Sequence, residues 1–355
     1  MHNKQQITGW LFLLLLCVAG CGQPVSKKQN TMINWTKLPD LPGAADTASL
    51  GVSAPFAGIH NGVLIVAGGC NFPDKPVTEG GAKRYYSEIF VLLPEGWKEI
   101  DRLPRPVAYG ATVSTPEGIV CIGGNNSDSS LVEVSRISYN PTKGEVAVCA
   151  LPSLPSPMDN LSAAFTGQEI YVAGGNENGQ PCHTFLRLNL ANIEKGWEQL
   201  PDFPGAARVQ PVLAAGESPN GTRIYLAGGF QPILNEEEPI VPTDVLVFDP
   251  ATFTWQQETV LPPFKDGTNR TLTGGCAVTF QNLIYGRCEL RLFLSRHRPT
   301  DPFSESGGGA RFSGHYPPAS GSQGLYAPSG RMVPIQYHLT SIRPIHESME
   351  RSGRI

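Results

Sequence analysis

The sequence has little charge, no basic excess and no long stretches of helical periodicity. Asp, Glu, Lys and Arg make up 16% of its 355 residues, and the formal net charge is -4. This balance excludes an overall basic field that would attract nucleic acid. Among 39 glycines and 32 prolines, runs with the apolar spacing of a helix are hard to find, which indicates short strands joined by many turns. We expect an all-β fold.

Cysteine pairs with the spacing of a zinc site are also missing. The eight cysteines include no CxxC pair, so no metal site is predicted. Cys121 and Cys276 lie inside apolar strand patterns, where a small buried thiol is expected. An oxidising compartment would permit a disulfide, but the sequence does not indicate which cysteines would pair.

Residues 1–21 have the pattern of an export signal. Lys4 precedes the apolar run from Trp10 to Leu16, which suits a secretory signal and is too short to span a bilayer. The run ends in Val-Ala-Gly-Cys21, which resembles the lipobox of bacterial lipoproteins. We therefore expect lipidation at Cys21, a tether over residues 22–34, and a lipid-anchored protein on the periplasmic side of the cell envelope, at the outer membrane. The alternative is an ordinary cleaved signal in which Cys21 has no role.

Four similar segments recur along the chain: GVLIVAGGCN, GIVCIGGNN, EIYVAGGNE and RIYLAGGFQ. Their glycine doublets begin at residues 68, 123, 174 and 228, at intervals of 55, 51 and 54 residues, close to the kelch period of about 50. Trp97, Trp197 and Trp255 follow three of the doublets, each shortly before a Leu-Pro pair; the second repeat has VAVCALPSLP instead. Each repeat predicts an inner strand, two middle strands and an outer strand. Residues 35–285 are thus expected to form a kelch-type β-propeller; a β-sandwich with chance glycines is the alternative.

The two ends of the repeat region are irregular. WTKLPDLP, residues 35–42, has the form of an outer strand without inner strands before it, and would close the ring by joining the last blade. A fifth repeat opens at Arg270 with RTLTGGCAVTFQNLIY, but GRCELRLF replaces the glycine doublet expected after Tyr285. We expect four complete blades and a partial fifth.

The composition changes after Tyr285. Residues 286–355 hold nine Arg and no Lys, Asn or Trp, whereas residues 1–285 hold eight Arg, ten Lys, seventeen Asn and all five Trp. Three interpretations remain open: a frameshift or sequence error after Tyr285, a disordered basic tail, and a separate small domain. We favour the first. On that interpretation residues 286–355 form a tail that is out of frame and unrelated to the repeats.

The stretch from residue 51 to 113 resembles the N-acetylneuraminate epimerases, or sialic acid mutarotases. It contains PFAGI, LIVAGG, KRYYSEI and RPVAYGATV, against the family's series GFAGI, LIFAGG, KSYSTDI and GRAYGVSL. The series comes first here and late in the family, so the chain resembles a cyclically permuted branch. The resemblance covers residues 35–285. It implies a six-bladed propeller that interconverts the α and β anomers of free N-acetylneuraminate in the periplasm, without a cofactor.

Mutarotation requires removal of the anomeric hydroxyl proton, protonation of the ring oxygen, rotation and reclosure. A carboxylate suits the general base, and a guanidinium suits the substrate carboxylate. The family associates these roles with a GExKPGxRT-like motif, which is absent here and whose expected place falls after Tyr285. This absence puts catalysis by the chain in doubt and leaves the catalytic residues unassigned, with Glu177 and Glu79 as candidates for the base.

Residues expected to line the sugar site come from two sources. The resemblance suggests Asn71, Lys83, Arg84, Tyr86 and Tyr109. Repeat position adds Asn125, Asn160, Asn176, Glu177 and Arg208, with Arg208 as the preferred cation. Each could instead be a solvated loop residue or cap a turn. Two functions stay open: a sialic acid mutarotase, and a non-catalytic surface lipoprotein that binds a glycan or a protein. The sequence does not predict the oligomeric state.

Overall fold

A computed structural model describes residues 37–43, 50–218, 221–232, 239–280 and 283–292, and three short strands between 325 and 337. The chain divides into two compact units, residues 1–39 and 40–355, and the architecture below belongs to the second. The expected signal, the tether and most of the expected tail lie outside the described residues. No helix in the described part of the chain is both long enough and apolar enough to cross a membrane.

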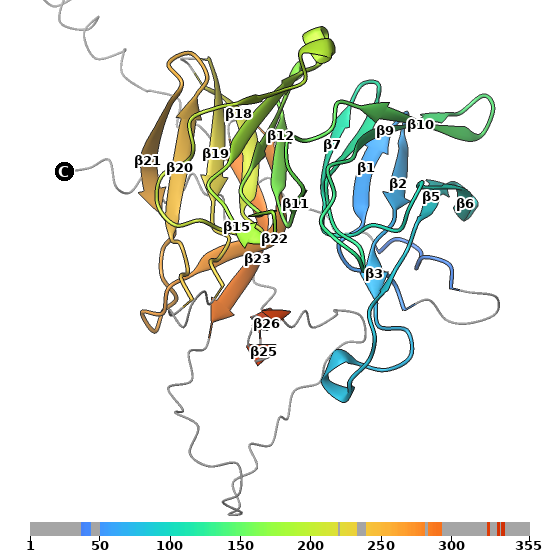
Figure 1. The fold of residues 1–355 in the computed structure, drawn as a ribbon, viewed down its shortest axis with the longest axis horizontal. Helices are drawn as coiled ribbons and strands as arrows, with labels where there is room; N and C mark the ends of the chain where they lie inside the picture. The colour runs from blue at the N-terminus through green and yellow to red at the C-terminus, as the bar shows by residue number, and fades with distance from the viewer. Residues whose placement is uncertain are drawn as a thin grey trace, which may run out of the picture. The chain divides into compact units, whose positions relative to one another are not determined.

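Four antiparallel four-stranded sheets, here called blades 1 to 4, follow one another along the chain (Figure 1). Blade 1 contains β1 (Phe56–His60), β2 (Val63–Ala67), β5 (Glu88–Leu93) and β6 (Gly96–Arg102). Blade 2 contains β7 (Ala111–Thr115), β8 (Gly118–Ile122), β9 (Val134–Asn140) and β10 (Glu145–Leu151). Blade 3 contains β12 (Ser162–Phe165), β13 (Glu169–Ala173), β16 (Phe185–Asn189) and β17 (Trp197–Gln199). Blade 4 contains β18 (Val212–Ser218), β19 (Gly221–Ala227), β20 (Asp244–Asp249) and β21 (Thr254–Val260). The predicted all-β, kelch-type propeller fold is confirmed.

A partial blade 5 follows. It pairs β22 (Thr271–Phe280) with β23 (Leu283–Leu292), and β26 (Ile335–Tyr337) pairs with β23. The shorter elements are β3 (Cys70–Asn71) with β4 (Arg84–Tyr85), β11 (Met158–Asp159) with β14 (Asn176–Glu177) and β15 (Gln180–Pro181), β24 (Leu325–Tyr326) with β25 (Met332–Val333), and the 3₁₀ helices η1 (Val77–Glu79) and η2 (Leu190–Lys195).

Each hydrophobic core is shared by two consecutive blades. β8 shows why, because both of its faces are buried: Ile119 and Cys121 belong to the core shared with blade 1, whereas Val120 and Ile122 belong to the core shared with blade 3. Further cores join blade 3 to blade 4 and blade 4 to blade 5. β8 is therefore continuously apolar rather than alternating. Cys121 is buried, as its strand pattern predicts.

The glycine doublets end the second strand of each blade where the next blade approaches. Gly68 has φ +66°, and a Cβ there would lie 2.5 Å from the carbonyl oxygen of Val107. The second glycine then donates its N–H to that oxygen, at 2.8 Å for Gly69. The same bond recurs as Gly124 to Met158 (2.8 Å), Gly175 to Arg208 (2.9 Å) and Gly229 to Leu272 (2.5 Å). Only glycine combines the positive φ with this close approach.

The predicted outer strands form where tryptophan precedes Leu-Pro. Trp97, Trp197 and Trp255 lie on β6, β17 and β21. Two of the indoles donate to proline carbonyls of the preceding blade's outer segment, Trp197 Nε1 to Pro152 and Trp255 Nε1 to Pro201, both at 2.9 Å. Residues 37–43, the described part of WTKLPDLP and the residue after it, form no strand. A strand requires a neighbouring backbone for pairing.

The break after Tyr285 does not interrupt strand pairing. In blades 1 to 4 the second strand ends directly before the glycine doublet, whereas β23 continues to Leu292. Its pairing with β22 passes through Gly286 opposite Ala277 and shifts register between Leu272 and Cys276. Residues 286–292 are therefore extended as part of β23, and the out-of-frame origin of residues 286–355 stays a prediction. Residues that lack the positive φ of the doublet continue the strand instead of turning.

Candidate functional site

Five residues at equivalent positions connect the blades in sequence. Ala54, Tyr109, Asn160, Gln210 and Gly274 all have left-handed backbones, with φ between +50° and +62°. Each N–H donates to the carbonyl of the preceding member, at 3.0 Å from Tyr109 to Ala54, 2.7 Å from Asn160 to Tyr109, 2.7 Å from Gln210 to Asn160 and 3.1 Å from Gly274 to Gln210. Left-handed non-glycine residues are uncommon and cluster at functional sites. We call this set the inter-blade chain.

A network of polar side chains accompanies the inter-blade chain, centred on Asp159. This carboxylate is buried, with 4% of the residue exposed. It accepts hydrogen bonds from Ser130 Oγ, from Asn160 Nδ2 at 2.5 Å and from Asn176 Nδ2 at 2.8 Å. Because the donors come from blades 2 and 3, Asp159 ties the two blades together. A buried carboxylate needs such donors to offset its lost hydration.

The network extends toward blade 5. Gln210 Nε2 donates to Asn160 Oδ1 at 2.8 Å, and Thr273 Oγ1 donates to Gln210 Oε1 at 3.2 Å. Side chains from four consecutive blades, Ser130, Asn160, Gln210 and Thr273 among them, are thereby joined through Asp159. This arrangement brings polar groups together that lie far apart in the sequence.

Lys83 and three aromatic rings lie beside this network. Its Nζ donates to Tyr109 Oη at 3.1 Å and lies 4.7 Å from the centroid of that ring. Phe72 and Tyr85 are within 5.8 and 5.9 Å of the ammonium group. Cys70 Sγ donates to Tyr109 Oη from the other side at 3.5 Å. Lys83 is exposed, so the site includes a solvent-accessible cation.

Tyr85 connects the lysine group to Asp159 electrostatically. Burial, together with the nearby Cys70 and Asp159, raises the pKa of Tyr85 to about 12. The phenol therefore stays protonated at neutral pH and can donate a hydrogen bond. Asp159 is close enough for its charge to act on this group.

Asn125 follows the second glycine doublet and pairs with two segments. Its N–H donates to Ala108 O at 2.7 Å and its carbonyl accepts from Ala108 N at 2.9 Å, while Ser130 bridges its other side. Its side-chain Oδ1 is buried and has no hydrogen-bond partner among the described residues. A buried acceptor of this kind is unusual in folded proteins.

The remaining residues of the first repeat hold the β3–β4 hairpin. Tyr86 Oη donates to Asn71 Oδ1 at 2.7 Å, and Asn71 Nδ2 donates to Gly51 O at 2.8 Å. Arg84 is exposed and lies opposite Asn71 in the pairing. Asn71 and Tyr86 therefore fix the backbone around Lys83, and Arg84 adds a second exposed cation.

The two carboxylates named as candidate bases differ in setting. Glu177 follows Asn176 on β14, is half-buried, and accepts a hydrogen bond from Thr184 Oγ1 at 2.5 Å. Glu79 is exposed in η1, on the excursion between β3 and β4. Glu177 is the more enclosed of the two carboxylates.

Arg208 differs from its expected role. Its side chain has 0% exposure, and its guanidinium contacts Asp244 at 2.8 Å, Ala206 O at 3.0 Å and Gly228 O at 3.2 Å. The repeat places Val107, Met158 and Leu272 at this position, where each accepts the same glycine N–H. Arg208 was expected to be the cation of the sugar site. The structure instead places it, fully buried, at an otherwise apolar position, and its donors are used within blade 4.

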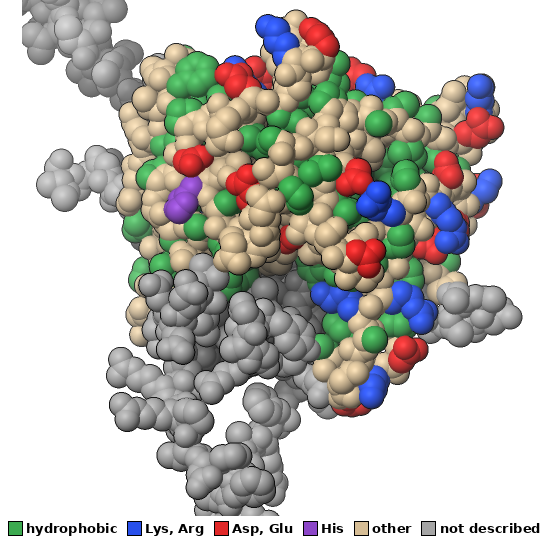
Figure 2. Space-filling model, in the orientation of Figure 1, with side chains coloured by type: hydrophobic (Ala, Val, Ile, Leu, Met, Phe, Trp, Pro, Cys, Tyr) green, Lys and Arg blue, Asp and Glu red, His purple; other side chains and the backbone are tan. Residues whose placement is uncertain are grey.

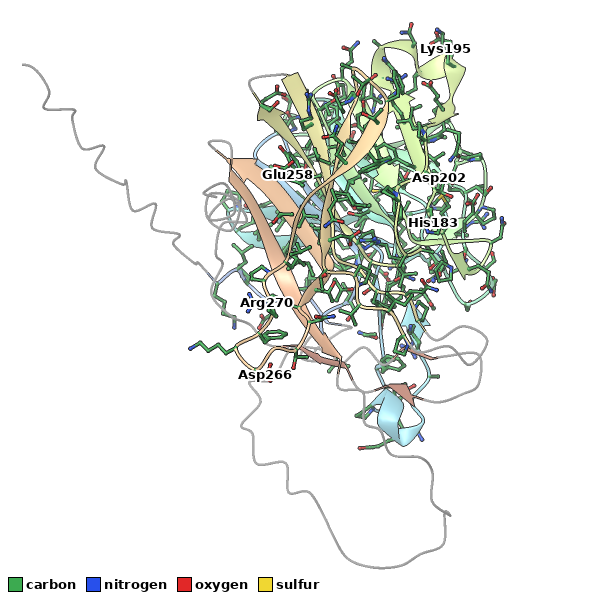
Figure 3. All side chains as sticks on the ribbon, turned by 90° about the vertical axis from the view of Figure 1, so that its left-hand side faces the viewer. His183, Lys195, Asp202, Glu258, Asp266 and Arg270 are labelled. Carbon is green, nitrogen blue, oxygen red and sulfur yellow. The ribbon has the colours of Figure 1, made fainter. Side chains whose placement is uncertain are left out.

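Sequence reasoning missed Asp159 and Gln210. Gln210 is the blade 4 counterpart of Tyr109 and Asn160, so superposing the repeats would have revealed it. Asp159 corresponds to Ala108, so the repeats give no signal for it. Arg270 precedes β22, with its guanidinium 4.7 Å from the centroid of the Phe264 ring. It lies away from the end of the sheets that carries Lys195 (Figure 3). On the face shown in Figure 2, acidic and basic side chains are interspersed.

Comparisons with known proteins give the same family. The family model of N-acetylneuraminate epimerase matches residues 23–146 and 151–287. An N-acetylneuraminate epimerase of Yersinia enterocolitica is 32% identical over 128 residues, 33% of each chain. One from Haemophilus influenzae is 32% identical over 121 residues, 31% of this chain and 32% of its own. The chain thus matches about a third of the length of these curated relatives.

The fold has a counterpart among solved structures. The structure of YjhT matches with a TM-score of 0.56 and 12% sequence identity, over 76% of this chain and 88% of that one. At this identity the likeness concerns the fold. The family model, in contrast, covers more than half of the 355 residues. The chain therefore belongs to the N-acetylneuraminate epimerase family.

Proposed function

We propose that this protein interconverts the α and β anomers of free N-acetylneuraminate by opening and reclosing the sugar ring. The observation that supports this most is the contact of Lys83 with Tyr109, whose backbone joins it to Asn160 of the Asp159 network. A cation, phenols, amides and a carboxylate suit a polyhydroxylated sugar acid. Membership in the epimerase family supplies the substrate class.

Lys83 is the proposed partner of the substrate carboxylate. Its ammonium is exposed and forms no ion pair among the described residues, while Tyr109 and the neighbouring rings restrict its position. A charge-assisted hydrogen bond to a carboxylate contributes about 1.5 to 3 kcal/mol. This pairing would orient the anomeric carbon, which carries the carboxylate.

Glu177 is the proposed general base. The carboxylate of Asp159 is occupied by three hydrogen bonds within the protein, whereas Glu177 accepts one, from Thr184. The proton of the anomeric hydroxyl would pass to Glu177, the bond between the anomeric carbon and the ring oxygen would break, and Glu177 would deliver the same proton to the ring oxygen. Rotation of the resulting ketone and reversal of these steps give the other anomer.

Anomer exchange followed by NMR tests the proposal. The purified protein is added to freshly dissolved crystalline β-anomer, and the approach to equilibrium is compared with buffer alone. We expect acceleration, a KM raised about tenfold in Lys83→Met, and a kcat lowered about 100-fold or more in Glu177→Gln. Lys98→Met, on the outer strand β6, is the matched control and should be unchanged.

A protein that binds the sugar without accelerating exchange would contradict the proposed reaction. That result would favour the second candidate, a non-catalytic glycan-binding propeller. The missing GExKPGxRT-like motif is the observation in its favour.

We further propose that Cys21 carries the lipid anchor of an envelope protein. The lipobox-like VAGC sequence supports this. Mass spectrometry of the protein from bacterial membranes should show an acylated N-terminal cysteine, and Cys21→Ala should move the protein to the soluble fraction. An unmodified Cys21 would overturn the proposal.

A further inference from the structure

Asn125 Oδ1 has a property that the rest of the polar network lacks. The amide groups of Asn160 and Gln210 are used within the network on both their nitrogen and oxygen atoms. Asn125 Oδ1 is buried without a partner among the described residues. An unsatisfied buried acceptor costs about 1 to 3 kcal/mol. The protein retains that cost in its free state, and a donor that reached the atom would remove it.

The backbone around Asn125 is fixed from both sides. One side pairs with Ala108, directly before Tyr109 of the inter-blade chain, and the other bridges to Ser130. Ser130 Oγ in turn donates to Asp159. The loop between Asn125 and Ser130 is held by the same buried carboxylate that orients the amides of Asn160 and Asn176.

We infer that Asn125 Oδ1 is a specificity-determining acceptor for an O–H or N–H group of the sugar acid, and that Asp159 is the positioning residue that holds it in place. The inference rests on the proposed sugar site but requires no catalysis. In this inference Asn125 Oδ1 accepts a hydrogen bond from the ligand, and Asp159 fixes the position of the loop that carries Asn125. A hydroxyl or acetamido N–H of N-acetylneuraminate has the required donor chemistry.

The first test concerns the free protein. Asn125→Leu replaces the unsatisfied amide with an apolar side chain of similar size, so stability in urea should be unchanged or higher. Asn140→Leu is the matched control: Asn140 Oδ1 accepts from the N–H groups of Thr142 and Lys143 at 3.0 and 3.1 Å, and its loss should lower stability. If Asn125→Leu were clearly less stable than wild type, Oδ1 would be engaged in the free protein and the inference would be wrong.

The second test measures affinity for N-acetylneuraminate by titration calorimetry. Asn125→Leu should weaken binding about tenfold, whereas Asn140→Leu should leave it unchanged. Asp159→Asn should also weaken binding, but should add little in the Asn125→Leu background, because it acts through Asn125. Fully additive losses would overturn the positioning role.

These outcomes separate the inference from the proposed reaction. Binding with the expected variant pattern but without anomer exchange contradicts only the reaction. A wild-type protein that does not bind N-acetylneuraminate overturns the inference as well.

Discussion

Arg208 and Asp244 form a two-pronged ion pair that joins the loop before β18 to the start of β20. Nη1 lies 2.8 Å from Oδ1 and Nη2 lies 3.0 Å from Oδ2. The arginine side chain is fully buried, whereas that of Asp244 is 19% exposed. A charged pair thus occupies a position that blades 2 and 3 fill with Val107 and Met158, and its role is structural.

Removing only the arginine should destabilise the fold. In Arg208→Met, Asp244 is left without its partner, and we expect the free energy of unfolding to fall by about 2 to 3 kcal/mol. The loss is smaller than for a fully buried charge, because water can hydrate the exposed part of Asp244. Arg208→Met with Asp244→Asn should recover more than half of the loss. Urea denaturation of the three proteins checks this. Equal stability of the single variant and wild type would contradict it.

The glycine doublets allow steric contact to be separated from backbone strain. Gly174 has φ +61°, and a Cβ there would lie 2.8 Å from Arg208 O, whereas Gly179 has φ +80° with nothing within 4 Å. Gly179→Ala should cost about 1 kcal/mol from the left-handed backbone alone. Gly174→Ala should cost at least about 1 kcal/mol more, because it also displaces the next blade. Similar losses in thermal unfolding would mean that the doublet does not set the blade spacing.

Much of the architecture follows from local sequence. The doublet glycines need positive φ and close approach, the Trp and Leu-Pro pairs mark outer strands, and Ile119 to Ile122 are apolar because both faces of β8 are covered. Because these signals recur in each repeat, the strand order predicted for one repeat applies to all four blades.

The site was less predictable, because its contacts cross between blades. Nothing near Asp159 in the sequence indicates that Ser130 and Asn176 will share its carboxylate. Arg208 was misjudged for the same reason: its partner, Asp244, is 36 residues away. An arginine before an inner strand looks like a free cation until the third strand of its blade is placed.

Tyr85 should make stability depend on pH in the alkaline range. Burial and the negative groups Cys70 and Asp159 raise its folded-state pKa to about 12, above the unfolded value of about 10. The folded protein therefore holds this proton more tightly, so the contribution is fully present below pH 10 and is lost as the pH rises from about 10 to 12. Tm measured across this range should fall less steeply in Tyr85→Phe than in wild type. Parallel curves would contradict the assignment.

The repeat pattern stops after Tyr285, and we propose that a single-base shift in the coding frame at this point replaced the continuation of the repeat. With the frame shifted by one base, the codons for Cys288 and Glu289 can give only Val or Ala, and those for Glu289 and Leu290 only Asn or Ser. The shifted frame would therefore place small residues followed by a polar residue near the position of the glycine doublet, as in the GGCN sequence of the first repeat.

Sequencing the gene from independent isolates checks the frame, and an uninterrupted, reproducible frame would sink the idea. In a restored-frame protein, we expect β23 to end at a turn and the following strands to cover the edge of blade 5. An uncovered sheet edge has unpaired backbone groups that can pair with another chain and cause aggregation. That protein should therefore have a higher Tm and remain monodisperse at higher concentration than the present chain. A fall in either property would show that residues 286–292 belong to the native fold.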